Sequence, residues 1–343
     1  MKTAIIGAGG IAGPHAKAIM SLGIEIAGVL DVNEDNARAL AGSCGSCVIK
    51  DLDDVLGDID IIHLLTPPSQ RVEYVRKAAA AGVHILIEKP IATTIEDAKT
   101  IIALAKEGGV KLMVNFNHRF RDGYRMLKGA FDSGSLGDVV SIYSHRVGVG
   151  YGFLGALKPS WRTQRELQCG MCVESLSHDI DMILQIAGGV DSISAVVGES
   201  IAELPGFDNN ASISFRTDKG AVGSIHASWS SHLGHSERGV IGTKGSAVLS
   251  GADLFNFEEF TIKKEGMAYP QVTKIGDVFA LANIGDDSFR RTSGHFMECI
   301  RSGTEPEATG EDGLNALTFS LAILESSRTG KVVPVKIRTT RRT

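Results

Sequence analysis

The strongest constraint on the fold is a regular alternation of short apolar runs with helical segments up to about residue 115. The runs are rich in Ile, Leu and Val and lack polar alternation, which is typical of strands buried on both faces. They lie at residues 3–7, 24–31, 47–50, 60–66, 84–88 and 111–116. Segments between them, such as 95–107, carry apolar residues at spacings of three and four. Since strand–helix–strand units form parallel sheets with right-handed crossovers, we predict a doubly wound parallel sheet.

The pattern changes after residue 120. Here the β-like runs alternate in places between polar and apolar residues, as at 212–215, and they lie at 192–199, 211–216, 221–230, 238–243 and 246–250. Such alternation indicates an open, predominantly antiparallel sheet with one solvated face. Helices are expected near 172–187, 286–302 and 312–328. The chain is therefore expected to be an α/β protein that divides into residues 1–120 and 121–343.

Composition places the chain among globular proteins and limits its partners. Hydrophobic residues make up 43% and charged residues 22% of the 343 residues, both near the globular average. The 35 basic and 40 acidic residues leave a net charge of −5 without a basic block, so we expect no nucleic-acid partner. No apolar run approaches the roughly 18 residues of a membrane span. The five cysteines are too few for a disulfide framework, which favours the cytoplasm.

A glycine-rich loop follows the first predicted strand. Residues 7–12 read Gly-Ala-Gly-Gly-Ile-Ala, which fits the pattern GxGxxA between a strand and a helix. Gly7 allows a sharp turn, Gly9 lets backbone approach a pyrophosphate, and Ala12 permits close helix-to-strand packing. The free N–H groups of the helix start favour a phosphate. In this context the loop predicts a dinucleotide site formed by Gly7, Gly9, Gly10, Ile11 and Ala12.

Asp31 ends the second predicted strand, about two dozen residues after the loop. A carboxylate there can accept hydrogen bonds from the adenosine ribose hydroxyls and repels a 2′-phosphate. No arginine follows until Arg38, so NAD is favoured over NADP, although NADP stays possible. The alternative is that Asp31 is a turn or helix-capping residue.

Further motifs are spread over nearly the whole chain. They are GAGGIAGPH at 7–15, TPP at 66–68, IEKP at 87–90, NHRF at 117–120, WR at 161–162, ESLSHDID at 174–181, GVIGTKGSAVL at 239–249 and EDGLNALTFSLAILESSRTG at 311–330. Together they resemble the Gfo/Idh/MocA oxidoreductases, a family named for glucose-fructose oxidoreductase, inositol dehydrogenase and the MocA protein. The resemblance implies an N-terminal Rossmann domain and a C-terminal α/β domain that binds substrate. It also implies homodimers or homotetramers formed through the open sheet of the second domain.

Lys89 is the first candidate catalytic residue. It follows a predicted buried strand, and open α/β sheets bind ligands beyond the carboxyl ends of their strands. Pro90 favours an extended conformation at Lys89. A partly desolvated ammonium there can bind the substrate oxygen and stabilise developing negative charge on it. The residues alone leave open a surface lysine lying over an apolar strand end, whereas the resemblance implies that the lysine of EKP belongs to the catalytic site.

Glu174 and His178 form the second candidate pair. They are four residues apart on a predicted helix, so their side chains are expected on one face. A carboxylate beside an imidazole selects its tautomer and suits it to acid–base work near neutral pH. His178 is expected to accept the substrate proton during oxidation, and Glu174 is expected to orient the His178 imidazole. Asp181 is expected to be a structural hydrogen-bonding residue. The resemblance implies that the family frequently carries Asp at the position of Glu174, so it stays open whether Glu174 touches substrate or only His178. An ordinary ion pair on the helix surface is the other alternative.

Other candidates come from the same motifs. For the cofactor they are Thr66, Pro67, Glu88, Lys89 and Arg162, and for the substrate Asn117, His118, Arg119 and Trp161 together with His178. Packing between domains and surface charge explain these residues about equally well. Arg71 departs from the family pattern, in which many members carry histidine, and this weakens the helix after TPP as a cofactor contact.

Two CxxC pairs, Cys44–Cys47 and Cys169–Cys172, could in principle form a tetrahedral zinc site. They fall in different predicted domains, so we expect no metal.

The sequence as a whole predicts an NAD(P)-dependent oxidoreductase that moves hydride between nicotinamide and a secondary hydroxyl or ketone of a sugar or an inositol-like polyol. The alternatives are an NAD-dependent glycoside hydrolase of the same fold and a non-catalytic NAD-binding module.

Overall fold

The computed structural model describes residues 1–149, 161, 164, 167, 169–201, 205–277 and 287–339. The contacts divide the chain into two units, the first comprising Met1–Phe120 and Ala280–Leu314 and the second Arg121–Phe279 and Asn315–Thr343. We predicted one division after residue 120, and the structure differs in that a later segment returns to the first unit. The reason is packing, because helix α9 (Ser288–Ser302) lies against α1 (Ala12–Ser21).

The first unit is built on a parallel sheet with the strand order β2-β1-β3-β4-β5 among the described residues. Its strands are β1 (Lys2–Ile6), β2 (Glu25–Leu30), β3 (Ile61–Leu64), β4 (His84–Ile87) and β5 (Leu112–Val114). β3 and the last three residues of β4 are fully buried, in agreement with their continuous apolar sequences. The predicted strand at 47–50 was wrong, because Val48 forms only an isolated bridge to Val29 there.

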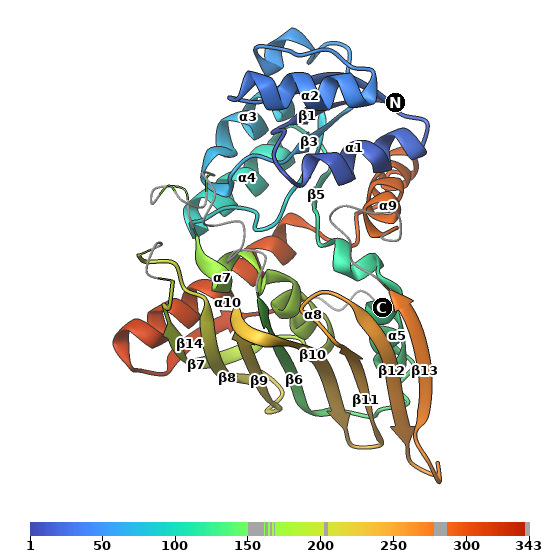
Figure 1. Cartoon of the computed structure of the whole chain (residues 1–343), viewed down its shortest axis with the longest axis vertical. Coiled ribbons are helices and arrows are strands. Elements are labelled where there is room, and N and C mark those ends of the chain that lie inside the picture. The colour runs from blue at the N-terminus through green and yellow to red at the C-terminus, as the bar shows by residue number, and fades with distance from the viewer. Residues whose placement is uncertain are drawn as a thin grey trace. The chain divides into compact units, whose positions relative to one another are not determined.

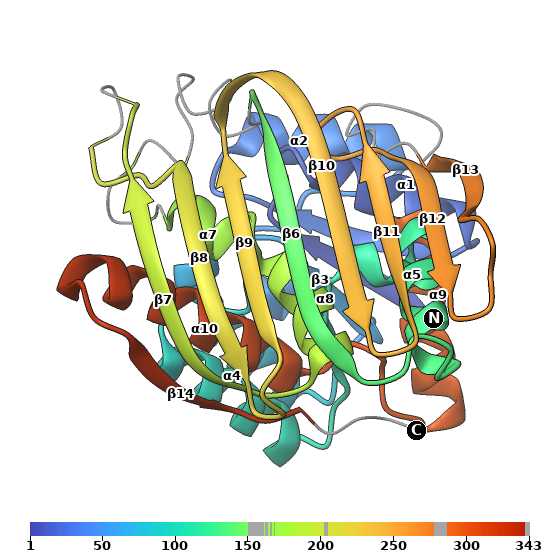
Figure 2. The ribbon, with the colours of Figure 1, turned by 90° about the horizontal axis from the view of Figure 1, so that it is seen from below.

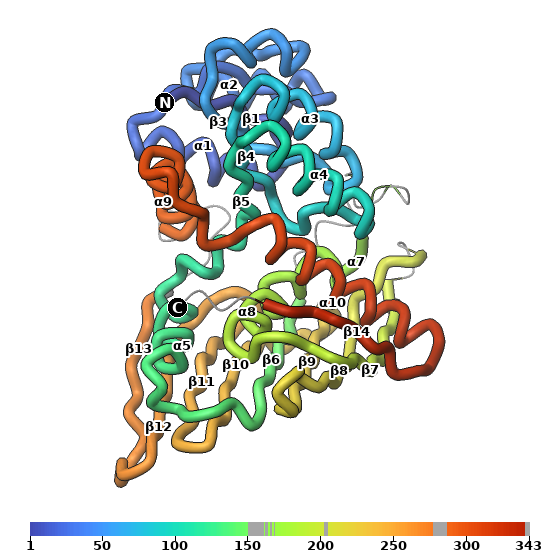
Figure 3. The backbone as a smooth tube through the Cα atoms, turned by 180° about the vertical axis from the view of Figure 1, so that it is seen from behind, coloured from blue at the N-terminus to red at the C-terminus, as the bar shows by residue number. Residues whose placement is uncertain are grey.

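Helices cover both faces of this sheet. They are α1, α2 (Glu34–Cys44), α3 (Val72–Ala80), α4 (Ile95–Glu107) and α9, with short 3₁₀ turns η1 (Leu52–Asp54), η2 (Pro68–Gln70) and η3 (Asn117–Phe120). α1 packs with α2 and α9, and α3 packs with α4, as Figures 1 and 3 show. Side-chain caps fix helix starts, since Asn33 accepts hydrogen bonds from two amides of α2 and Thr94 accepts one from α4.

The second unit contains a sheet of nine strands within the described ranges, in the order β13-β12-β11-β10-β6-β9-β8-β7-β14. The strands are β6 (Val139–Val149), β7 (Val190–Gly198), β8 (Asn210–Thr217), β9 (Val222–Ser228), β10 (Ser230–Gly242), β11 (Gly245–Gly251), β12 (Phe257–Lys264), β13 (Gln271–Asp277) and β14 (Val333–Ile337). Its pairs are antiparallel except β6 with β9. The predicted open, predominantly antiparallel sheet is therefore confirmed.

Helices line one face of this second sheet. They are α5 (Asp122–Asp132), α7 (Gly170–Glu174), α8 (Ser177–Ala187) and α10 (Gly310–Thr329), the last of which begins in residues grouped with the first unit. Figure 2 shows the sheet from its other side, with the strands in front of α5, α8 and α10. Burial alternates along β8 and β9, as the sequence predicted. The predicted helix at 172–187 differs in being interrupted at Ser175 and Leu176, between α7 and α8.

Candidate cofactor site and candidate catalytic residues

The glycine loop follows β1 and has the geometry that its pattern predicts. Gly7 has φ +104°, and a Cβ there would lie 2.9 Å from the backbone of Leu65 and Thr66. Only glycine fits such a close approach at that φ. Gly9 is exposed, and no described atom lies within 4 Å of the position of its Cβ. Ala12 is fully buried against β1 and β2, so α1 starts close to the sheet.

The start of α1 and the end of β2 present complementary groups. Ile11 occupies the N-cap position and offers no side-chain hydrogen bond, so no side chain caps the first amides of the helix. Asp31 follows β2 and accepts hydrogen bonds from the amides of Ala8, at 2.5 Å, and Asn33, at 2.7 Å. Its carboxylate is thereby fixed beside the glycine loop. These contacts also give Asp31 the turn-capping role that the sequence left open.

The residues after β3 lie on the same edge. Thr66 is buried, and its Oγ1 has no hydrogen-bond partner among the described residues. Pro67 follows and is half-buried. An unsatisfied buried hydroxyl next to an open glycine loop is a feature that a bound ligand can explain. Together with Gly9 and Asp31, it shows that the residues present fit a dinucleotide.

Glu88 follows β4 and is held in a buried polar network. His15 Nε2 lies 3.0 Å from Glu88 Oε1, and the Asn115 amide also donates to Oε1. Burial alone would raise the pKa of Glu88, but the hydrogen bond and charge of His15 hold that pKa below its ordinary value. Nδ1 of His63 lies 3.1 Å from Nδ1 of His15, and burial lowers the pKa of His63. Glu88, predicted to contact the cofactor, is thus engaged with the protein itself.

Lys89 is half-buried and lies directly beyond this network. Its backbone amide donates to Glu88 Oε2 at 3.1 Å, and its peptide bond to Pro90 is cis. Because β2, β1, β3 and β4 are neighbours, the segments that follow them share one edge of the sheet. Lys89 therefore lies at the same edge as the glycine loop, Asp31 and Thr66, which is where open α/β sheets bind ligands.

We doubted from the sequence that the helix around Arg71 contacts the cofactor, and in the structure the Arg71 side chain contacts the protein backbone. Its side chain is buried and donates to three backbone carbonyls, those of Thr66, Glu88 and Pro90. The sequence marked this residue as unusual but contained no local signal for the inward direction of its side chain. His15 and His63 were also missed, although a histidine inside an apolar run such as DIIHLL could have indicated a buried polar contact.

In the second unit, Glu174 ends α7 and His178 lies in the first turn of α8, and both are buried. The turn between the helices means that their four-residue spacing does not follow the regular helical geometry that we assumed. Asp208 holds the start of α7, since its carboxylate accepts from the Cys172 amide at 2.7 Å. The Tyr124 hydroxyl donates to the His178 carbonyl at 3.3 Å. The catalytic roles of Glu174 and His178 stay predictions.

Asp179, next to His178, forms a buried ionic cluster that the sequence did not indicate. Its two carboxylate oxygens contact Arg146 Nη1 at 2.7 Å and Arg238 Nε at 2.9 Å, and Ser144 donates at 2.8 Å. Burial alone would raise the pKa of Asp179, but the two guanidinium groups hold it far below its ordinary value. The cluster ties the first turn of α8 to β6 and β10.

The remaining candidates occupy different surroundings. Asn117 donates to Ser288 Oγ at 2.9 Å, and Arg119 pairs with Asp312 at 3.2 Å, so both are engaged within the first unit. His118 is buried in the same turn, η3. Trp161 is half-buried, and Arg162 lies outside the described residues. Asp181 accepts from Gln185 at 3.0 Å, which matches the structural part expected of it.

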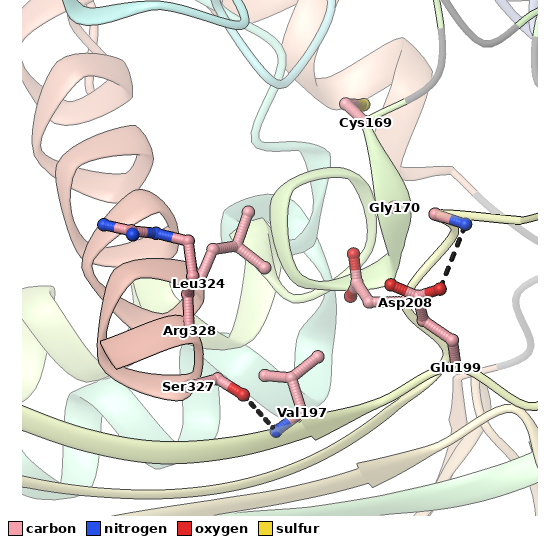
Figure 4. Close-up of a pocket in the computed structure, with 9 residues that line it drawn as sticks. Cys169, Gly170, Val197, Glu199, Asp208, Leu324, Ser327 and Arg328 are labelled. Carbon is pink, nitrogen blue, oxygen red and sulfur yellow. Dashed lines mark hydrogen bonds between the residues drawn. The ribbon is translucent and has the colours of Figure 1, made fainter. Parts of the chain in front are cut away.

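The described residues contain a cavity away from the predicted site and no candidate metal centre. No group of three or more His, Cys, Asp or Glu side chains is placed to hold a metal ion there. A cavity of about 470 Å³ in the second unit is lined by Cys169, Gly170, Val197, Glu199, Gly206, Asp208, Leu324, Ser327 and Arg328. Figure 4 shows Ser327 accepting the hydrogen bond of the Val197 amide at 2.9 Å beside this cavity. None of the predicted site residues that the structure describes lines it.

The parallel sheet, the glycine loop and Asp31 define a dinucleotide-binding protein of the Rossmann class. Residues 1–116 match the oxidoreductase family with an NAD-binding Rossmann fold, and residues 128–337 match the C-terminal α/β domain of the same family. The chain belongs to this family, the Gfo/Idh/MocA oxidoreductases, which confirms the resemblance that its motifs showed.

Relatives of known activity match over nearly the whole chain. A scyllo-inositol 2-dehydrogenase (NAD⁺) of Bacillus subtilis is 26% identical over 98% of this chain and 97% of the relative. A myo-inositol 2-dehydrogenase of Thermotoga maritima is 27% identical over 98% and 99%. In fold, the chain is similar to levoglucosan dehydrogenase solved with NADH and L-sorbose, with a TM-score of 0.86 and 22% identity over 98% of both chains.

Proposed function

We propose that the chain is an NAD-dependent oxidoreductase that interconverts a secondary hydroxyl and a ketone on a sugar or an inositol-like polyol. One observation carries the proposal: Gly7, Gly9, Asp31 and Lys89 lie at one edge of one parallel sheet. The edge thus combines a cradle for a dinucleotide with an ammonium suited to an alcohol oxygen. The two inositol dehydrogenases related along the full length support this substrate class.

Each residue in this proposal has one task. Bound NAD supplies the hydride acceptor, and NADH the donor for the reverse reaction. Lys89 holds the substrate oxygen and stabilises negative charge on it, while His178 accepts the hydroxyl proton and Glu174 orients the imidazole. A general base of this kind typically contributes about 10²- to 10⁴-fold in rate. Trp161 and the segment Asn117–Arg119 are proposed substrate neighbours, and Thr66, Pro67, Glu88 and Arg162 cofactor neighbours.

The first experiment is a screen with NAD, NADP and a panel of inositols, sugars and sugar acids, read by NADH absorbance. Net NADH formation with an oxidised product supports the proposal. Release of free sugar from a glycoside without net NADH would replace it by the hydrolase alternative. Tight NAD binding without any hydride exchange would replace it by the binding-module alternative.

The second experiment tests the base. His178→Ala is expected to lower kcat by about 100-fold or more while NAD affinity stays nearly unchanged, because a proton acceptor acts on the reaction and not on cofactor binding. Gln185→Ala on the same helix is the matched control. Near-normal turnover in His178→Ala would remove the proposed role.

We also propose that a second copy of this chain covers the open face of the nine-stranded sheet. Val196, Val222 and Ile241 are exposed there on β7, β9 and β10, and such apolar groups on an uncovered sheet favour association. Sedimentation at micromolar concentration tests this, and a monomer would contradict it.

No helix of the described residues is long and apolar enough to cross a membrane. The sparse cysteine content supports a cytoplasmic location.

A further inference from the structure

Arg71 is a buried cation placed among backbone oxygens. It occupies the N-cap position of α3, and the residue is 2% exposed. Burying a guanidinium is costly unless its N–H groups are satisfied. Nε and Nη2 donate to the Thr66 carbonyl at 3.0 and 2.8 Å, and Nη1 donates to the carbonyls of Glu88 and Pro90.

These carbonyls come from the two turns that end β3 and β4. The oxygens of Glu88 and Pro90 belong to the residues immediately before and after Lys89. Carbonyl oxygens that point toward one place repel each other, and a planar guanidinium with donors in a fixed fork can satisfy all of them. Arg71 therefore bridges the Thr66 turn to both sides of Lys89.

A second set of contacts holds the same turn through a side chain. The Glu88 carboxylate accepts from His15, from Asn115 and from the Lys89 amide. Glu88 and Asn115 are nearly inaccessible to water, as is His15. The residue before Lys89 is thus held at its carbonyl by Arg71 and at its carboxylate by buried partners. This leaves little freedom for the backbone that carries the Lys89 side chain.

We infer that Arg71 is a positioning residue for Lys89: its guanidinium fork fixes the Glu88–Lys89–Pro90 turn relative to Thr66, and so sets where the Lys89 ammonium meets the substrate oxygen. The inference rests on the proposed function of Lys89. Since a misplacement of about 1 Å in a catalytic constellation can cost about 100-fold in rate, the effect is expected mainly in kcat.

The test compares Arg71→Gln, Arg71→Lys and Arg71→Gly with Arg76→Gln and Arg76→Gly. Arg76 lies on the same helix but is exposed, in a surface pair with Glu73 at 3.3 Å. Arg71→Gln is expected to lower kcat about 100-fold, with the Kd for NAD changed about threefold or less. Arg71→Lys keeps the charge but loses the fork, so it is expected to recover only part of the loss. Guanidinium ion at millimolar concentration is expected to restore at least about tenfold of kcat to Arg71→Gly and to leave Arg76→Gly unchanged.

Hydrogen exchange of the peptide covering residues 86–92 provides a readout without turnover. Faster exchange is expected in Arg71→Gln and not in Arg76→Gln, because the turn loses its fork. Wild-type kcat in folded Arg71→Gln, or a lower Tm with unchanged kcat and unchanged exchange, would overturn the inference. Should Arg71→Gln fail to fold, wild-type kcat in Arg71→Lys or no response of Arg71→Gly to guanidinium would overturn it equally. If the wild-type protein transfers no hydride, the proposed function fails, while the exchange comparison still decides whether Arg71 fixes the turn.

Discussion

Removing the charge of Asp179 is expected to destabilise the second unit strongly. The carboxylate has no exposed area and contacts two guanidinium groups, at 2.7 Å from Arg146 and 2.9 Å from Arg238. The Nη1 and Nη2 atoms of Arg238 are buried without a hydrogen-bond partner among the described residues, so Asp179 is the carboxylate that balances this buried guanidinium there. Asp179→Asn keeps the shape but leaves two buried cations without their counter-charge. Breaking a buried pair in this way costs about 3–5 kcal/mol.

The size of the effect can be measured by calorimetry. For a unit of this size, about 1 kcal/mol shifts Tm by about 2–4 °C, so Asp179→Asn is expected to lower the Tm of its transition by about 6–20 °C. Asp132→Asn makes the same chemical change in the exposed pair Lys128–Asp132, whose contact is 2.5 Å. That surface pair is worth about 0.3–0.5 kcal/mol, so Tm should fall by no more than about 2 °C.

A Tm shift in Asp179→Asn no larger than in Asp132→Asn would refute this reasoning. A further variant tests the cause. Combining Asp179→Leu with Arg146→Met and Arg238→Met removes the uncompensated charge together with its partners, and it is expected to recover much of the lost stability. A combined variant as unstable as Asp179→Asn would show that packing, and not charge, dominates at this position.

Three further outcomes are expected. The stability difference between wild type and Asp179→Asn should be constant above about pH 5 and shrink as the pH falls below about 4. The reason is that the pKa of Asp179 is lower in the folded than in the unfolded state, so the ionised carboxylate stabilises the fold and this stabilisation is lost on protonation. Urea unfolding at several pH values measures the difference, and a difference unchanged at pH 3 would contradict the prediction. Asp31→Ser should weaken NAD binding by about 10-fold or more and reduce the preference for NAD over NADP, since a charged hydrogen bond is worth about 1.5–3 kcal/mol; titration calorimetry with both cofactors decides this, and unchanged affinities would remove the ribose contact. Gly7→Ala should lower Tm, because a Cβ meets backbone at 2.9 Å, whereas Gly9→Ala should keep Tm and weaken NAD binding, because its Cβ would enter open space at the loop; equal Tm values for both variants would contradict the assigned geometry.

The candidate site could be predicted from the sequence to different depths in its two halves. At the parallel sheet, each predicted group follows a strand, and strand ends are marked locally by the change from apolar residues to Gly, Asp or Pro. Gly7, Asp31, Thr66 and Lys89 could therefore be placed at one edge of the sheet from the sequence. Glu174 and His178 were predicted from spacing along one helix, and the turn at Ser175 and Leu176 shows that spacing alone does not give their geometry.

The parallel sheet, the glycine loop after β1 and the family could be read from the chain alone, because apolar periodicity and short motifs are local properties. The folded chain was needed to show three other features: Arg71 turns inward to three carbonyls, a buried network joins His15, His63, Glu88 and Asn115, and Asp179 contacts Arg146 and Arg238. Those charged and polar groups come from segments far apart in sequence. Whether such a group faces water or the interior depends on which partners the fold brings to it, and no local pattern carries that information.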